Sequence, residues 1–359
     1  MNKREFLKLS ALASIAIAST PINALAGSVS EKSASRKKRW KNWVWINPKL
    51  DEQEADVDAT YKKYKDAGIT GIFFEADSEM HFKTAKRNKL EAHRWLVINK
   101  RFDKALMAAH PEWYVVNKNA VSCIEKTAYV ERYRWVCPAR EEVRQYLENE
   151  VHEVLQKDYV DGIHLDCIRY PDVALPVGLW ERYNVVLDKE LPDCDYCYCD
   201  VCREKYKQET GIDPIEIQYA DQSPGWRKFR YDQVSQLVDR LVLVARKNKK
   251  PITAAVFPTP EIAKRLVRQD WTRWKLDAAC PMIYHGQYKE PTRWIGQAVA
   301  EGVEAVNGKF PIFAGILTGH FNSADDFKDG IRYALQNGAK GVCIFGKLDD
   351  AFLDALKTA

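Results

Sequence analysis

The residues best suited to chemistry lie in the segment 159–171, which reads YVDGIHLDCIRYP. If this segment is a strand, alternation places His164 and Asp166 on one face, while the opposite face is apolar and suited to packing against helices. A carboxylate on the interior face needs a partner, and Arg169 is the nearest cation in the sequence. Asp166 is therefore either a reacting group or half of a buried ion pair with Arg169, whereas we interpret His164, one layer deeper, as a core histidine.

Two further carboxyl groups, Glu75 and Asp270, follow other strand-like runs. A pair of carboxyl groups can divide acid–base work, because one donates a proton while the other stays ionised to act as base or nucleophile. We predict that Asp166 takes part in catalysis, with Glu75 ahead of Asp270 as its partner. The separations are not encoded in the sequence, so the assignment of acid and base stays open.

Polar and aromatic residues near the ends of other runs are candidates for substrate binding. They are Asn47, Trp95, Arg169, Trp271, Tyr284 and His285. Tyr284 is equally well interpreted as a residue that lines an apolar pocket, and most tryptophans of a folded chain are core residues. We therefore expect only one or two of the tryptophans to stack on a sugar.

Eight short runs of β-branched or aromatic residues alternate with helical patterns along the chain. They span residues 43–46, 71–74, 92–98, 162–168, 252–257, 278–284, 311–317 and 341–345. This rhythm predicts an α/β protein with a closed (β/α)8 TIM barrel, because closure leaves no edge strand. A doubly wound sheet is the alternative, but no glycine-rich phosphate loop follows the first run. In a barrel the candidate residues above gather at the carboxyl ends of the strands.

Four cysteines, Cys194, Cys197, Cys199 and Cys202, fall within nine residues of each other. Four thiolates match the ligand set of a structural zinc ion, and a site with four protein ligands leaves no position for a reacting water. Two disulfides are the competing interpretation, since an oxidising compartment favours them. The spacing leaves both open. No organic cofactor is expected.

The amino-terminal residues predict export. A basic start, an apolar run over residues 9–22 and the sequence Ala-Leu-Ala at 24–26 indicate a signal peptide over residues 1–26. A polar linker over 27–40 would precede the barrel at 41–359, which carries a cysteine-rich insertion at about 172–225 after the fourth strand. We expect a protein of the periplasm or the cell surface with no integral membrane segment, because no later apolar run is long enough to cross a bilayer.

Charge excludes one class of partner. The 55 Lys and Arg residues and 50 Asp and Glu residues are mixed along the chain, and the net charge is only +5. A nucleic-acid-binding protein would instead concentrate basic residues on one element or face. The oligomeric state is left open by the sequence.

Several motifs resemble those of glycosyl-hydrolase-like family ten, a barrel group of bacterial envelope proteins. They are DGIHLDxIRYP at 161–171, HPEW at 110–113, WxCP at 135–138, QDW at 269–271, and Asp277 with PMIY at 281–284. They occur in the expected order over nearly all of the mature chain. The resemblance implies a barrel with glycosidase-type chemistry at its mouth. At residues 73–77 the sequence FFEAD departs from the family pattern, which puts Glu75 forward as a site residue of a subgroup.

Two more distant similarities bear on mechanism and metal. Glycoside hydrolase family 18 carries a catalytic Glu at the end of its fourth strand, where this chain has Ile168, so the similarity implies a related barrel but not that family's mechanism. The segment Cys197-x-Cys199-x-x-Cys202 is similar to the structural zinc site of family 42 β-galactosidases, in which a more distant Cys completes the set.

Two functions follow as hypotheses. The first is an exported glycoside hydrolase that cleaves glycosidic bonds of a polysaccharide or glycan fragment with paired carboxylates. The alternative is a barrel that binds glycan without cleaving it. In both cases the partner is a carbohydrate.

Overall fold

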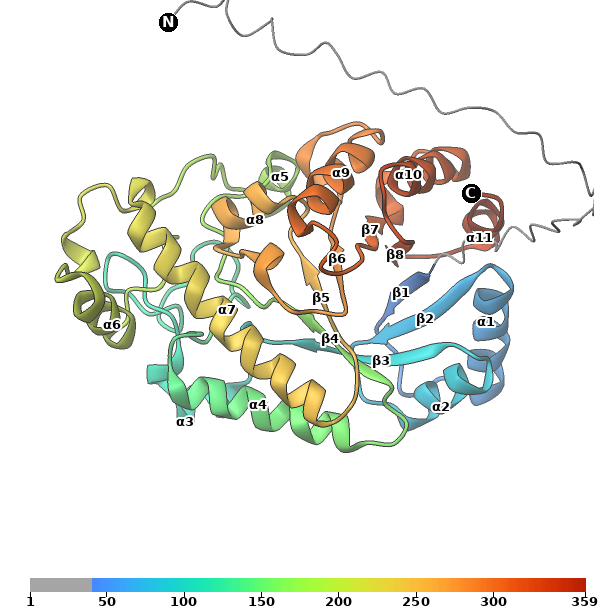
Figure 1. Cartoon of the computed structure of the whole chain (residues 1–359), viewed down its shortest axis with the longest axis horizontal. Helices are drawn as coiled ribbons and strands as arrows, with labels where there is room; N and C mark the ends of the chain where they lie inside the picture. Colours follow the sequence, from blue (N-terminus) through green and yellow to red (C-terminus); the bar gives the residue numbers. More distant parts are fainter. Residues whose placement is uncertain (1–40) are drawn as a thin grey trace, which may run out of the picture. The chain divides into compact units, whose positions relative to one another are not determined.

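The computed structural model describes residues 41–359, so the predicted signal peptide and linker lie outside the described residues. Eight parallel strands form one sheet in the order β6-β5-β4-β3-β2-β1-β8-β7. Parallel bridges join Ala279 to Ile312 and Met282 to Gly315, and they connect the two ends of this order. The sheet is thus a barrel with alternating helices, which confirms the predicted (β/α)8 fold (Figure 1).

All eight predicted runs are strands. They are β1 (Asn42–Ile46), β2 (Ile69–Phe74), β3 (Glu91–Val97), β4 (Gly162–Asp166), β5 (Ile252–Val256), β6 (Ala278–Pro281), β7 (Ala314–Leu317) and β8 (Val342–Phe345). The fourth and sixth strands end earlier than predicted, at Asp166 and Pro281. Cys167 adopts a positive φ of 49°, which turns the chain out of the strand direction directly after Asp166.

Helices cover the outside of the barrel (Figure 1). They are α1 (Glu54–Asp66), α2 (Glu79–Arg87), α3 (Lys104–Ala109), α4 (Glu141–Gln156), α5 (Trp180–Tyr183), α6 (Asp200–Thr210), α7 (Pro224–Lys247), α8 (Pro260–Val267), α9 (Trp294–Val306), α10 (Ala324–Gln336) and α11 (Asp350–Lys357). In α4 the buried residues Val143, Leu147, Val151 and Leu155 recur every four positions and form one apolar stripe. None of the helices in residues 41–359 is long and apolar enough to cross a membrane.

Capping residues set the starts of the two helices that flank β5. Ser223 precedes Pro224 of α7 and accepts a hydrogen bond from the backbone N–H of Trp226. Before α8, Thr259 accepts a hydrogen bond from the backbone N–H of Ile262, and Pro260 occupies the first helical position. A side-chain acceptor satisfies a free N–H, and proline at this position loses no hydrogen bond. The residues at which α7 and α8 begin are therefore determined by the local sequence.

The barrel interior is filled with aromatic side chains and a histidine. His164 stacks on Phe73 with ring centroids 3.8 Å apart. Its Nε2 accepts a hydrogen bond from Trp45 Nε1 at 2.9 Å, which leaves Nδ1 to donate to Thr253 Oγ1 at 2.8 Å. Burial lowers the pKa of His164 well below its usual value, so the ring is neutral. His164 is a fully bonded core histidine, as interpreted from the sequence.

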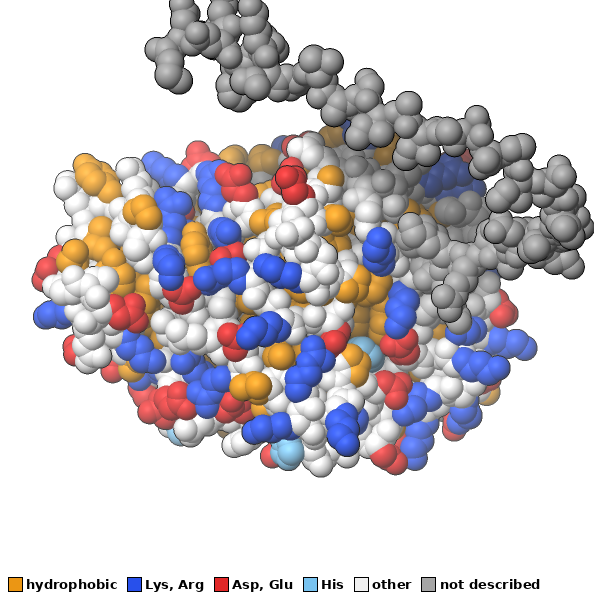
Figure 2. All heavy atoms as spheres, in the orientation of Figure 1, with side chains coloured by type: hydrophobic (Ala, Val, Ile, Leu, Met, Phe, Trp, Pro, Cys, Tyr) orange, Lys and Arg blue, Asp and Glu red, His pale blue; other side chains and the backbone are white. Residues whose placement is uncertain are grey.

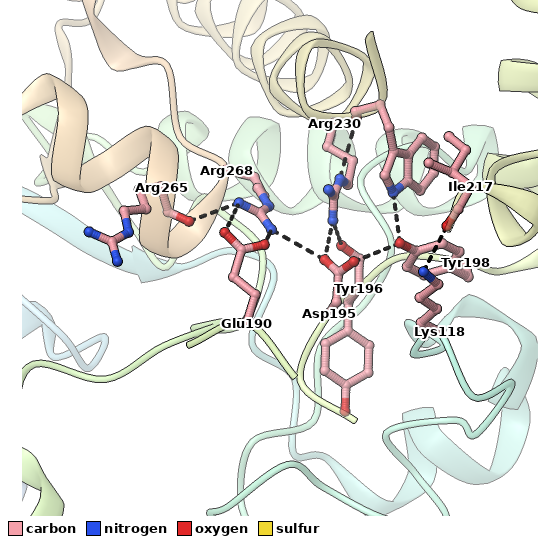
Figure 3. A network of polar contacts seen from close by, with 10 residues as sticks. Lys118, Glu190, Asp195, Tyr196, Tyr198, Ile217, Arg230, Arg265 and Arg268 are labelled. Atoms are coloured by element: carbon pink, nitrogen blue, oxygen red, sulfur yellow. Dashed lines mark hydrogen bonds and ion pairs between the residues drawn. The ribbon is translucent and has the colours of Figure 1, made fainter. Parts of the chain in front are cut away.

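A buried ionic network anchors the long segment between β4 and α7 (Figure 3). Asp195 is bonded by Arg230 of α7, by Arg268 after α8 at 3.3 Å, and by the hydroxyl of Tyr198 at 2.6 Å. Arg268 also pairs with Glu190. Because both arginine side chains are fully buried, their charges need carboxylate partners to offset the cost of removing them from water. The network ties the insertion to two helices of the barrel.

Candidate functional site

Asp166 is the last residue of β4 and lies at the carboxyl end of the barrel. Its Oδ2 accepts a hydrogen bond from Trp95 Nε1 at 3.1 Å, and its Oδ1 accepts one from the backbone N–H of Cys167 at 2.6 Å. Both donors are uncharged, and in residues 41–359 no salt bridge reaches this carboxylate. Each carboxylate oxygen thus accepts one N–H group, which fixes the orientation of the side chain.

Arg169 pairs with a residue that the sequence analysis missed. Its Nη1 lies 3.2 Å from Asp172 Oδ2, and Tyr129 donates its hydroxyl to the same oxygen at 2.7 Å. The alternative interpretation, in which Asp166 forms an ion pair with Arg169, is therefore wrong. The physical reason is the turn at Cys167, which takes Arg169 away from the strand and toward the carboxylate three residues later.

An aromatic platform lies beside Asp166. Phe345, the last residue of β8, is 38% exposed, and its ring centroid lies 6.2 Å from that of Trp95, 6.3 Å from that of Tyr284 and 6.4 Å from that of Trp45. Burial and then the charge of Asp166 raise the pKa of the Tyr284 hydroxyl well above its usual value, so this hydroxyl keeps its proton and can donate it to a hydrogen bond. The platform thus combines an exposed ring with a neighbouring donor and a carboxylate.

Two hollows open at the carboxyl ends of the strands. The first has a volume of about 160 Å³ and is lined in part by Arg169, Asp172, Arg182, Phe257, Tyr284 and Tyr288. The second has a volume of about 520 Å³ and is lined in part by Trp45, Asn47, Lys49, Glu52 and Lys347. Phe345 connects them, because its ring contacts Tyr284 of the first hollow and Trp45 of the second.

The other two predicted carboxylates differ in their surroundings. Glu75 follows β2 directly and is half-buried, so it lies at the same end of the barrel as Asp166. Asp270 lies before the short helix η5 (Trp271–Arg273), where its oxygens contact Lys264 at 3.1 Å and Arg273 at 2.8 Å. These contacts connect Asp270 to α8 and η5, in the segment of chain between β5 and β6. The catalytic roles of these residues stay predictions.

Among the six predicted binding residues, three line the mouth in different ways and three, Arg169 included, are buried. Asn47 is exposed in the larger hollow, Trp95 holds Asp166, and Tyr284 borders the smaller hollow. His285 is buried with its ring 4.9 Å from that of Phe321. Trp271 is fully buried, so neither face of its ring is open to a sugar.

The four cysteines that converge are Cys137, Cys197, Cys199 and Cys202. Their sulfur atoms all lie within 4.8 Å of one another, and Cys137 Sγ lies 3.4 Å from that of Cys202 and 3.7 Å from that of Cys199. Sulfurs bound to zinc at about 2.3 Å in a tetrahedron lie roughly 3.8 Å apart. All nine cysteines of the chain are free, so the two disulfides of the competing interpretation are not formed in this structure.

The predicted ligand Cys194 is wrong as a member of this cluster, because it packs instead against Leu175 and Leu187. Cys137, which replaces it, comes from the WxCP motif that precedes α4. The side chain of Arg140, three residues later, is mostly buried and bonds to Asp200 beside the cluster. A cation at this place offsets negative charge on the sulfurs.

Comparisons with known proteins show the fold. No family model matches the chain, and no curated protein matches it. The structure resembles the PgaB (BpsB) glycoside hydrolase domain from Bordetella bronchiseptica, with a TM-score of 0.64, 12% identity, and coverage of 89% of this chain and 98% of that one. It also resembles the catalytic domain of a Paenibacillus polymyxa β-amylase, with a TM-score of 0.61, 9% identity, and coverage of 89% and 97%.

A third solved structure is a β-galactosidase from the psychrophilic Marinomonas ef1, with a TM-score of 0.60 and 10% identity. The match covers 89% of this chain and 58% of that one. At these identities the likeness is one of architecture. The chain has the barrel fold that these three carbohydrate-active structures share.

Proposed function

We propose that this chain is an exported glycoside hydrolase that cleaves a polysaccharide or glycan fragment at the carboxyl end of its barrel. The observation that carries the proposal is the placement of Asp166 beside the exposed ring of Phe345 and the protonated hydroxyl of Tyr284. A sugar offers an apolar face for a ring and hydroxyls for hydrogen bonds, so this combination of groups suits a carbohydrate. The likeness to glycoside hydrolase structures supports the same class.

In this proposal Asp166 is the ionised carboxylate. Its two N–H donors hold the side chain in place at the end of β4. Glu75 is the proton donor, because it lies at the same end of the barrel and shares the strand face of Phe73, which points into the interior. We assign no catalytic role to Asp270, because both of its oxygens contact cations of the surrounding helices.

The test compares Asp166→Asn with the wild type on a broad panel of glycans, read by product chromatography. We expect turnover to fall about 10²–10⁴-fold, the typical effect of losing a positioned acid or base. The melting temperature should change little, because asparagine keeps the size of the side chain and Arg169 retains its own partner, Asp172. Glycan binding by the wild type with no product would instead identify a barrel that only binds.

We further propose that Cys137, Cys197, Cys199 and Cys202 hold one structural zinc ion. The four sulfurs form the closed, all-thiolate set typical of such sites. When bound, zinc would crosslink the insertion to the segment before α4. Because all four positions are taken by protein, the ion supplies rigidity and takes no part in bond cleavage.

The zinc proposal is tested by elemental analysis of matched variants. The wild type and Cys194→Ser should each contain about one zinc per chain, while Cys137→Ser should contain none. Chelation should lower the melting temperature of the first two proteins only. Full zinc content in Cys137→Ser would refute the ligand set.

A further inference from the structure

We infer that the substrate is an acidic glycan, in which a sugar bearing a carboxylate or sulfate binds in the 160 Å³ hollow through Arg169 and Arg182. This inference rests on the proposed function and names its substrate class. Tyr284 lines the hollow and stacks on Phe345, whose ring also contacts Trp95. Trp95 in turn donates a hydrogen bond to Asp166. A sugar bound there would place its neighbour next to the carboxylate.

The guanidinium of Arg169 can bind a ligand only through the N–H groups at its edge. It packs against the rings of Trp135 and Phe257, whose centroids lie 4.7 Å and 4.9 Å from the central carbon. Hydrogen bonds are therefore confined to the plane of the group. Nη1 is used by the backbone oxygen of Tyr170 and by Asp172, whereas Nε is buried with no hydrogen-bond partner.

A buried donor without a partner is costly, and an acceptor supplied by a ligand removes that cost. A planar oxyanion suits a guanidinium edge best, because two of its oxygens can accept parallel N–H bonds. The residue is 7% exposed, so a bond made here is screened little by water. The feature that marks this place as a ligand site is an unpartnered nitrogen on a buried arginine that lines a cavity.

The charges around the hollow favour a negative occupant. Arg169 and Arg182 are cationic, and Asp172 is the only acidic residue among residues 41–359 that lines the cavity. Arg182 is exposed and has no ion-pair partner among residues 41–359, so its charge is available. Tyr133, Tyr183, Tyr284 and Tyr288 supply aromatic walls of the size that sugar rings need.

The larger hollow, which contains Trp45, is also lined by more cationic than acidic residues. Lys49 and Lys347 line it, with Glu52 as the only acidic residue of its lining. Neither lysine forms an ion pair within the described part of the chain. A glycan with repeated acidic groups would meet cationic side chains in both hollows.

The experiment measures binding by calorimetry to oligosaccharides of galacturonate, of glucuronate and of sulfated galactose, each paired with its carboxyl-reduced or desulfated form. At least one acidic probe should bind about tenfold or more tightly than its neutral partner, the effect of one charged hydrogen bond. Its affinity should fall as salt rises. The carboxylated and sulfated arms distinguish which oxyanion is recognised. Tighter binding of neutral forms, or no binding of any acidic probe, overturns the inference.

Two variants test the residues. Arg169→Lys keeps the charge but removes the planar edge, and it should lose the preference for the carboxylated probe. Because Arg169 is buried and this variant can unfold, Arg182→Gln at the exposed position serves as the second test, with an expected loss of about fivefold or more in affinity for the same probe. Arg332→Gln on α10, an exposed arginine that lines neither hollow, is the control and should bind normally. Unchanged affinity in Arg182→Gln and Arg169→Lys overturns the assignment.

Failure of this inference is distinguishable from failure of the proposed function. Cleavage of a neutral glycan that is lost in Asp166→Asn keeps the hydrolase and overturns the acidic substrate. Binding of an acidic probe that is never cleaved keeps the acidic ligand and overturns the hydrolase.

Discussion

Asp166 ends β4, and Asp195 lies in the insertion that follows this strand. The two carboxylates have different charged neighbours and different exposure. Asp195 is 4% exposed and contacts two arginines and a tyrosine hydroxyl. Although burial raises its pKa, the charges of Arg230 and Arg268 outweigh that effect and lower it. Asp166 is half-exposed and accepts only uncharged N–H donors.

The contrast separates a structural carboxylate from a candidate catalytic one. A carboxylate that is neutralised by cations on every side stabilises a fold but has no capacity left for a substrate. A carboxylate held by neutral donors at an open barrel end keeps its charge available. In this protein the surroundings therefore distinguish the two roles, although both residues are aspartates.

The largest effect on stability is expected at Asp195. Replacement by Asn leaves Arg230 and Arg268 buried with too little negative charge, so the free energy of unfolding should fall by about 3–5 kcal/mol. Asp193→Asn is the matched control two residues away, where the side chain is 49% exposed and the change should stay within about 0.5 kcal/mol. Denaturant unfolding measures both. Equal effects of the two substitutions would break the comparison.

A buried group whose burial outweighs the charges near it adds a third case. His93 is buried, and neither ring nitrogen has a hydrogen-bond partner. Burial lowers its pKa to about 4 from 6.5, so it is neutral in the folded protein at neutral pH. As the pH falls below 6.5 the unfolded chain takes up a proton that the folded chain refuses. Stability should therefore decline between pH 6.5 and pH 4, by up to roughly 3 kcal/mol from this group.

The His93 prediction is checked by unfolding at a series of pH values. His93→Gln should flatten the decline, because glutamine does not titrate. His152→Gln, at an exposed position on α4, should leave the slope as it is in the wild type. A slope unaffected by His93→Gln would mean that other buried groups, such as His164, carry the effect.

The smallest effect is expected at Phe345 and refines the account of the open barrel end. Phe345→Ala removes the exposed ring, so KM for the glycan should rise about three- to tenfold, as expected for one aromatic contact. The turnover number should change less than KM, since the ring binds substrate without exchanging protons. Phe102→Ala, at another exposed phenylalanine, should leave KM unchanged. An unchanged KM in Phe345→Ala would remove the platform from the proposal.

The sequence by itself determined the barrel and the position of Asp166. Alternation along a strand and four-residue spacing along a helix are local signals, so the eight strands and α4 were readable without any long-range information. The same alternation placed His164 in the interior and Asp166 at its open end. Three of the four converging cysteines were also readable, because they are adjacent in the chain.

Only the tertiary structure decided which distant groups meet. Cys137 joins Cys202 across 65 positions, and Cys194 is excluded although it is closer in sequence. Arg169 pairs with Asp172 and not with Asp166, because the positive φ of Cys167 turns the chain away from the direction of β4. Phe345 meets Trp95 and Tyr284 because a closed barrel brings the ends of β3, β6 and β8 to one opening. Closure is a property of the whole sheet, so no local pattern encodes the contacts that it creates.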